Sequence, residues 1–500
     1  MRTAKIPKKE IFLIADRDRS DVALRLSFLS TIISQKKNFE PLVLFNSKQT
    51  QEVKKIFKTF KIFNTKKVEL TLKDYFLYIL ISLKFVESLI KIAVKGFDWF
   101  VESYKINEIR LGDLIYDKYI RHDLSYLKPS LLDTKFIFLL LKSIYQYYVI
   151  ENIFVTNKVK LSLIGSLSYI STSNLILRIS QKNKIPTAFV SADGYKIYRK
   201  NTPPGDPIID EIERSLKKYK FNFLKKKSEI YFHQRIKGKL KKKRYDPKLF
   251  FQHDEQNWAK SASSNNKFLD NLKLLKKSYS KVILFAPHAF SECNHLFGDL
   301  IFRDFHQHSI ETLQFAREQK QTLWLYKIHP FSQIKYGEYN SSVKSFKKYS
   351  QKNILLVPMN IKTKDLFPHI DLVTSSRGTI CIEAATFGIK SLITTNIFYD
   401  NWKISHRAKN KNDYFQLLKN INLIKKPSNK TITMAKILLY LRKKLQSNFE
   451  YNLITPRKLI DKKEFFQILN KVDKTNNSKI YSLYSNIFKE LEKKNDKKKI

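Results

Sequence analysis

The chain has 500 residues, of which 43% are hydrophobic, and it carries a formal net charge of +49 at pH 7. This length exceeds that of a typical single domain, so we expect two or three domains. Its two cysteines, Cys293 and Cys381, lie far apart in the sequence, which excludes a disulfide framework and a site of closely spaced thiolates. We therefore expect a reducing compartment, the cytoplasm.

Most of the positive charge is lysine, and it accompanies abundant Ile, Asn, Phe and Tyr with little glycine. An AT-rich coding sequence produces such a composition without selection for a polyanionic partner. A strong positive field nevertheless attracts nucleic acids, anionic lipids and phosphorylated substrates. A nucleic-acid binder should concentrate basic and aromatic residues on one face or carry a recognised motif. Because the lysines are spread along the whole chain, we expect no nucleic-acid partner.

The N-terminal half has the alternation of strands and helices that is typical of an α/β protein. Lysines precede its first apolar run and leave no apolar core of the length of a signal peptide, so we expect no cleaved leader. The predicted elements are strand 11–14, helix 22–34, strand 41–45, helices 71–103 and 134–152, strand 161–166, a helix to 182, and strand 187–191.

The first long helical segment is amphipathic. Lys84, Lys91 and Lys95 fall on one side at helical spacing, and apolar residues such as Leu83 and Ile90 lie on another. A charge at the bilayer centre costs about 2.5–3.5 kcal/mol, so we expect neither long helix to span a membrane. The first helix either packs on its own domain or lies on an anionic membrane surface, where each lysine contributes about 1 kcal/mol.

The C-terminal half contains a second α/β pattern. A lysine-rich stretch at 225–275 separates the halves and is typical of an interdomain connection. The predicted elements are strand 281–287, helix 305–319, strands 322–327, 353–357 and 371–374, helix 379–387 and strand 391–394. We predict Rossmann-like domains over 1–225 and 276–425, a basic connection over 226–275 and a lysine-rich helical segment over 426–500.

Polar residues follow three strands of the C-terminal half, at the edge where open α/β sheets bind ligands. One group forms a turn into a helix, so hydroxyl groups, backbone N–H groups and the positive helix end all point to one place, which suits a phosphate. Glu383, one turn into the helix, is placed to reach ribose hydroxyl groups. Alternatively, a serine only caps the helix and Glu383 is solvated. The turn residues are Ser375, Ser376, Gly378 and Thr379.

Two further groups follow neighbouring strands. Lys327 and His329 project to the same side of an extended chain, and Pro330 ends the strand. They can hold a phosphate linkage and balance the charge of a departing nucleotide, although His329 can also be a plain surface residue. His288 shares its loop with a cysteine and a second histidine. Because that loop has no matching ligands elsewhere, we expect no metal site.

Together these segments resemble the capsule polysaccharide biosynthesis glycosyltransferases, which include the Kdo transferases. The resemblance covers about 280–400 well and the N-terminal half loosely. Lys390 and Glu292 stand where this family commonly has proline and aspartate, which suggests a divergent member. The resemblance rests on Pro287-His288-Ala289-Phe290-Ser291, Lys327-Ile328-His329-Pro330, Ser375-Ser376-Arg377-Gly378-Thr379, Glu383-Ala384 and Gly388-Ile389, and more faintly on Arg110-Leu111-Gly112-Asp113-Leu114-Ile115-Tyr116-Asp117.

The resemblance implies two Rossmann-like domains facing a cleft, the GT-B type, with extra helices in the N-terminal half and at the C-terminus. It implies transfer of a sugar from a nucleotide-activated donor, such as a CMP-linked sugar, to a growing glycan or glycolipid near the inner membrane, without a metal or cofactor. His329 would hold the donor phosphate, Ser375 and Ser376 would add hydroxyl contacts, and Glu383 would anchor the ribose. The full expected donor set is Lys327, His329, Ser375, Ser376, Gly378, Thr379, Glu383 and His288.

A transferase also needs a base that takes the proton from the acceptor hydroxyl group. Asp193 is the first candidate, because Gly194 after it lets a substrate approach closely, although an ordinary Asp-Gly turn is the alternative. Asp113 and Asp117 are the next candidates. Both can equally position an acceptor or cap helices.

Two other functions compete with sugar transfer on the same residues. Teichoic-acid-type polyol-phosphate transferases share the His-Pro element and a serine-rich loop, but their loop leads into an aspartate, whereas here Arg377-Gly378 leads to Glu383. A non-catalytic partner protein should have lost His329, Glu383 or the serine pair, and all are present. We therefore favour a glycosyltransferase.

Overall fold

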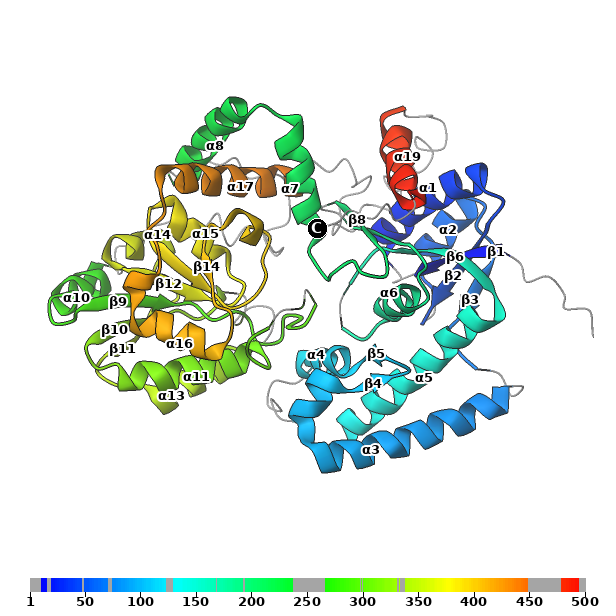
Figure 1. Cartoon of the computed structure of the whole chain (residues 1–500), viewed down its shortest axis with the longest axis horizontal. Coiled ribbons are helices and arrows are strands. Elements are labelled where there is room, and N and C mark those ends of the chain that lie inside the picture. Colours follow the sequence, from blue (N-terminus) through cyan, green and yellow to red (C-terminus); the bar gives the residue numbers. More distant parts are fainter. Residues whose placement is uncertain are drawn as a thin grey trace, which may run out of the picture. The chain divides into compact units, whose positions relative to one another are not determined.

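The computed structural model describes residues 10–15, 19–46, 49–70, 74–122, 129–167, 169–191, 194–236, 266–296, 298, 300–330, 332, 338–447 and 478–493. These residues form two compact units, each built around one six-stranded sheet (Figure 1). The first unit takes the described residues of 1–119, 128–211 and 445–500, and the second takes those of 120–127 and 212–444.

The sheet of the first unit has the strand order β3-β2-β1-β6-β7-β8. Its neighbouring strands are parallel, except that β8 runs antiparallel to β7. The central strands β1 and β6 are largely buried, as their runs of apolar residues predict for a sheet covered on both faces. The strands are β1 Glu10–Ala15, β2 Glu40–Phe45, β3 Thr65–Lys67, β6 Lys158–Ile164, β7 Thr187–Val190 and β8 Tyr195–Tyr198.

Helices and a small hairpin complete the first unit. The last helix, α19, returns from the far end of the chain to pack on α1 and adds Tyr484, Ile487 and Phe488 to the core. The long helix α3 lies beside α5 (Figure 1). The elements are α1 Ser20–Lys36, α2 Gln51–Thr59, α3 Tyr75–Ser103, β4 Lys105–Ile106, β5 Ile109–Arg110, α5 Thr134–Thr156, α6 Thr172–Lys182 and α19 Ser478–Glu492. Helix α4 Gly112–His122 lies largely in this unit, and α7 Pro207–Lys218 is divided between the two units.

The second unit contains a fully parallel sheet with the order β11-β10-β9-β12-β13-β14. Its strands are β9 Lys281–Phe285, β10 Thr322–Tyr326, β11 Ile354–Leu356, β12 Leu372–Ser375, β13 Lys390–Ile393 and β14 His406–Arg407. Its helices are α8 Phe221–Ile236, α10 Asn266–Lys276, α11 Phe305–Glu318, α13 Tyr339–Tyr349, α14 Thr363–Leu366, α15 Thr379–Thr386, α16 Lys411–Lys419 and α17 Asn429–Ser447, with short 3-10 turns η4 Phe367–His369, η5 Asp400–Trp402 and η6 Ile421–Leu423.

Both sheets have their strands in the order 3-2-1-4-5-6 when each set is numbered along the chain, which is the order of Rossmann-like domains. The predicted α/β fold with two Rossmann-like sheets is therefore confirmed. Within the described ranges, no helix combines the length and the apolar character that a bilayer crossing demands.

The segments outside the sheets divide between the units. Part of the expected connection is α8, which is tied to the second unit through an ion pair of 3.0 Å between Glu229 and Lys436 of α17. Residues 237–265, the middle of that connection, lie outside the described residues. In the C-terminal segment, α17 lies almost wholly in the second unit, whereas α19 belongs to the first.

Candidate functional site

His288 and His329 meet at the carboxyl edge of the second sheet. His288 follows β9 and His329 follows β10, and these strands are parallel neighbours, so their ends lie side by side. The centroids of the two imidazole rings are 5.3 Å apart. His288 also packs edge-on against Phe305 at 4.7 Å, and its Nε2 atom lies 3.3 Å from Oε2 of Glu292. Two residues of the expected donor set are thus brought together.

Burial determines the charge of His288. Its side chain is only 12% exposed, and the loss of solvent lowers its pKa to about 3, although Glu292 opposes that shift. The imidazole is therefore neutral at pH 7, and its contact with Glu292 is not an ion pair. Its buried Nδ1 atom has no hydrogen-bond partner within the described part of the chain. A neutral imidazole remains able to donate one hydrogen bond to a ligand.

Arg377, in the turn after β12, brings a permanent positive charge near His288. Its guanidinium lies over the ring of Phe305, at 5.7 Å, and Phe305 also contacts His288. The guanidinium donates hydrogen bonds of 3.3 Å to the backbone oxygen of Asn396 and to Oγ1 of Thr395. The positive charge of Arg377 also contributes to the lowered pKa of His288. The sequence motif contained Arg377, but sequence reasoning had not assigned it to the site.

Gly378 lets the turn close tightly against the start of α15. A Cβ atom at this position would lie 2.6 Å from Oγ of Ser375, closer than real side chains approach. Gly378 is also the N-cap residue of α15, and it has no side chain to accept hydrogen bonds from the first N–H groups of the helix. Its backbone oxygen accepts a 2.9 Å hydrogen bond from the hydroxyl group of Tyr399. The helix therefore begins at Thr379 without a side-chain cap from its N-cap residue.

Ser376 does not cap the helix, because it belongs to a buried polar chain. Its Oγ atom lies 2.6 Å from Nδ1 of His308 on α11, and Nε2 of His308 lies 3.0 Å from the hydroxyl group of Tyr414. That hydroxyl group is also within 3.1 Å of Oγ1 of Thr312. Burial lowers the pKa of His308 to about 3, so this ring is neutral as well. Sequence reasoning missed His308, since its position on a helix gives no local signal.

Glu383 forms a buried ion pair rather than being solvated. Its Oε1 atom lies 2.7 Å from Nη2 of Arg235 at the end of α8, and both side chains are less than 10% exposed. Arg235 also donates a 3.0 Å hydrogen bond to the hydroxyl group of Tyr231. Sequence reasoning had placed Arg235 in the connection between domains, so it could not foresee this partner.

Lys327 is engaged in the interior of the second unit. Its Nζ atom donates a 2.8 Å hydrogen bond to the backbone oxygen of Ile361. Burial lowers its pKa to about 8. The alternation of side chains along a strand had suggested that Lys327 acts together with His329, but the structure gives its amine a backbone partner after β11 instead.

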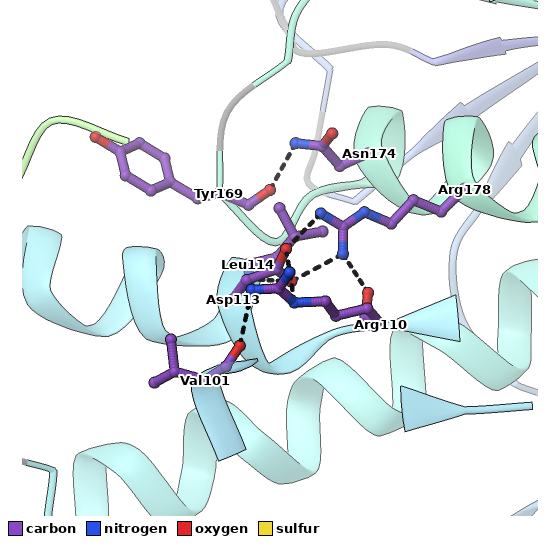
Figure 2. Close-up of polar contacts among 7 residues, drawn as sticks. All are labelled: Val101, Arg110, Asp113, Leu114, Tyr169, Asn174 and Arg178. Carbon is purple, nitrogen blue, oxygen red and sulfur yellow. Dashed lines mark hydrogen bonds and ion pairs between the residues drawn. The ribbon is translucent and has the colours of Figure 1, made fainter. Parts of the chain in front are cut away.

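In the first unit, Asp113 is the centre of a polar network that joins α4 to α6 (Figure 2). Both of its carboxylate oxygens accept 2.8 Å hydrogen bonds from Arg178, and Oδ1 also accepts one from the backbone N–H of Leu114. Arg110 approaches the same carboxylate at 3.5 Å, and its own backbone oxygen accepts a hydrogen bond from Arg178. A carboxylate held on both oxygens by a guanidinium is stabilised in its charged form, which favours a structural role.

The other two candidates for the base are Asp117 and Asp193. Asp117 lies on α4 and is 1% exposed. Asp193 lies outside the described residues. Next to it, Gly194 has a φ of 145°, and a Cβ atom there would lie 2.2 Å from Cγ of Glu211, so this position requires glycine.

The expected donor set lines no metal cluster among the described residues, and it takes no part in a pocket elsewhere in the second unit. Among the residues that the structure describes, no group of three or more His, Cys, Asp or Glu side chains is placed to hold a metal ion. An open pocket of about 420 Å³ is lined by Leu300, Ile301 and residues 409–412, which include none of the donor residues.

No protein-family model matches the chain, and no curated protein matches its sequence. Solved structures match it at low identity. KpsC, a beta Kdo 2,4 transferase of Thermosulfurimonas dismutans, is 12% identical with a TM-score of 0.32, over 56% of this chain and 79% of KpsC. MnaA of S. aureus, solved with UDP, is 12% identical with a TM-score of 0.27, over 90% of this chain and 99% of MnaA. A glycosyltransferase from Rickettsia africae ESF-5 is 10% identical with a TM-score of 0.27, over 96% of this chain and 99% of that one. Such low scores assign no function to the chain.

Proposed function

We propose that the chain is a glycosyltransferase that takes a sugar from a nucleotide-activated donor bound at the carboxyl edge of the second sheet. One observation carries this proposal. His288 and His329 follow two neighbouring strands with their rings 5.3 Å apart, and Arg377, in the turn just before α15, lies over Phe305, which His288 also contacts. The neutral imidazole of His288, a second imidazole, a fixed guanidinium and a helix N-terminus together suit the phosphate of a nucleotide.

The donor residues act in different ways in this proposal. His329 binds the donor phosphate, and Arg377 balances the charge that develops on the departing nucleotide. Ser375 and Ser376 contribute hydroxyl contacts, with Ser376 held in place by His308. Glu383 anchors the ribose, and Arg235 fixes its carboxylate.

On the acceptor side, we propose a growing surface glycan or lipid-linked glycan, as the resemblance to capsule polysaccharide glycosyltransferases implies. Asp193 takes the proton from the acceptor hydroxyl group. Asp113 is not proposed for this step, because Arg178 holds both of its oxygens.

Ligand-dependent melting tests the donor site. Purified protein is heated with CMP-, CDP-, UDP- or GDP-linked sugars, and a donor at a hundred times its Kd should stabilise the fold by about 2.7 kcal/mol. His329→Ala should melt like the parent protein without a ligand and lose this gain. The proposal is wrong if none of the nucleotide sugars raises the melting temperature. Release of the nucleotide only when an acceptor glycan is added would distinguish transfer from epimerisation of the donor.

A further inference from the structure

Helix α3 displays a row of large apolar side chains to solvent. We call this row the α3 stripe, and each of its members is between 51% and 79% exposed. Large contiguous apolar patches on a protein surface commonly mark binding sites. The members of the α3 stripe are Tyr75, Phe76, Ile79, Leu83, Val86, Ile90 and Val94.

The α3 stripe occupies one continuous face of the helix. After its first residue, its members are separated by three or four positions, which keeps them on one side of an α-helix. The buried residues Ile81, Ser88 and Ile92 repeat on the opposite side, and α3 packs against α5 (Figure 1). The stripe ends just before Gly96, whose φ of 78° kinks the helix. The helix therefore uses one apolar face for its own unit and leaves a second one open.

The charges favour an anionic occupant. Lys84 and Lys91 border the α3 stripe and share Glu87, at 2.9 and 2.5 Å, while Lys95 follows and lies 5.0 Å from the ring of Trp99. The whole chain carries a net charge of +49, so a second copy of the chain would be repelled and an anionic surface attracted. Apolar and aromatic residues bordered by lysines are typical of helices that lie in the headgroup region of a bilayer.

We propose that the α3 stripe is a docking face for an anionic lipid bilayer, on which α3 lies flat with its apolar side chains inserted. This docking is a property of the first unit and does not depend on the donor site.

Vesicle co-sedimentation tests the proposal with the full chain. The parent protein should bind phosphatidylglycerol vesicles, bind phosphatidylcholine vesicles far more weakly, and lose affinity as salt is raised. The triple variant Leu83→Ser, Val86→Ser, Ile90→Ser should bind the anionic vesicles roughly a hundredfold more weakly or worse, because the inserted area is lost. The double variant Lys91→Glu, Lys95→Glu should bind the anionic vesicles roughly thirtyfold more weakly or worse, because two attractive charges are lost and two repulsive ones are added.

Leu274→Ser is the matched control, since Leu274 is 64% exposed on α10 of the second unit, outside the stripe. It should bind vesicles like the parent protein, and all variants should keep the parent melting temperature. No binding to phosphatidylglycerol vesicles would overturn the proposal. So would equal binding by the triple serine variant, which would indicate general attraction by a basic protein. A dimer in sedimentation equilibrium that the triple variant dissociates would also overturn it, in favour of a second copy.

Discussion

Arg235 and Glu383 form an ion pair in the interior of the second unit, with Nη2 and Oε1 2.7 Å apart. The pair joins the end of α8 to α15, the helix that begins at the proposed phosphate site. Substitution of Glu383 should therefore affect the stability of the second unit, through this pair, and also the ligand binding that we propose for Glu383.

We expect Arg235→Met to destabilise the second unit by about 3–5 kcal/mol, because it leaves the Glu383 carboxylate buried without its charge partner. Urea unfolding at pH 7 measures this loss. The double variant Arg235→Met, Glu383→Leu should recover most of it, since no charge then stays buried. Equal stability of the parent and the single variant would show that the pair is not formed in solution.

Substitution of His329 should separate binding from folding. His329 is only partly buried at a strand end, so His329→Ala is expected to leave urea unfolding within about 0.5 kcal/mol of the parent. Donor affinity, measured by calorimetry, should fall by roughly tenfold or more as a charge-assisted hydrogen bond is lost. Glu383→Ala should instead lose both stability and affinity. Unchanged affinity in His329→Ala would move the donor site elsewhere.

Acid should weaken the second unit through its buried histidines. The pKa values of His288 and His308 are lowered from 6.5 to about 3 in the folded protein. Between these values the unfolded chain binds more protons than the folded one, so stability falls as the pH drops from about 6.5 towards 3. Each histidine contributes at most about 1.4 kcal/mol per pH unit. Urea unfolding at several pH values measures the slope.

His308→Gln should lower the stability at pH 7, because Ser376 and Tyr414 lose the imidazole ring that both contact. It should also reduce the slope of the free energy of unfolding against pH in the acid range. His406→Gln changes an exposed histidine on β14 and is the matched control, expected to keep the parent slope. An unchanged slope in His308→Gln would contradict the neutral, buried state of that ring.

Substitutions of Asp113 and of Asp193 should have different effects on stability and on kcat. Asp113→Asn is expected to cost about 1–3 kcal/mol of stability, because the bidentate pair with Arg178 is broken, while the folded protein keeps its kcat. Asp193→Asn should keep the parent stability and lose kcat by about a hundredfold or more, as expected for a general base. An inactive but fully stable Asp113→Asn protein would reverse these roles.

The order of strands and helices could be predicted from the sequence where the signal was local. Runs such as Ile11–Ile14 and Val282–Phe285 are apolar throughout because both faces of a parallel strand are covered, and this pattern needs no knowledge of neighbours. The short strands β3 and β14 were not predicted. Both are exposed and polar, so neither has an apolar pattern that marks it as a strand.

The strand ends from which His288, His329 and the Ser375-Ser376 turn project could be predicted from the amino-acid sequence, because the apolar strands are evident in it and their ends share one edge of a parallel sheet. Which side chains meet at that edge depends on the packing of distant elements. Ser376 pairs with His308, and Glu383 pairs with Arg235, whose position lies 148 residues away along the chain. Local periodicity reports which face of an element is buried, but it carries no information about the distant polar group that will satisfy a buried charge.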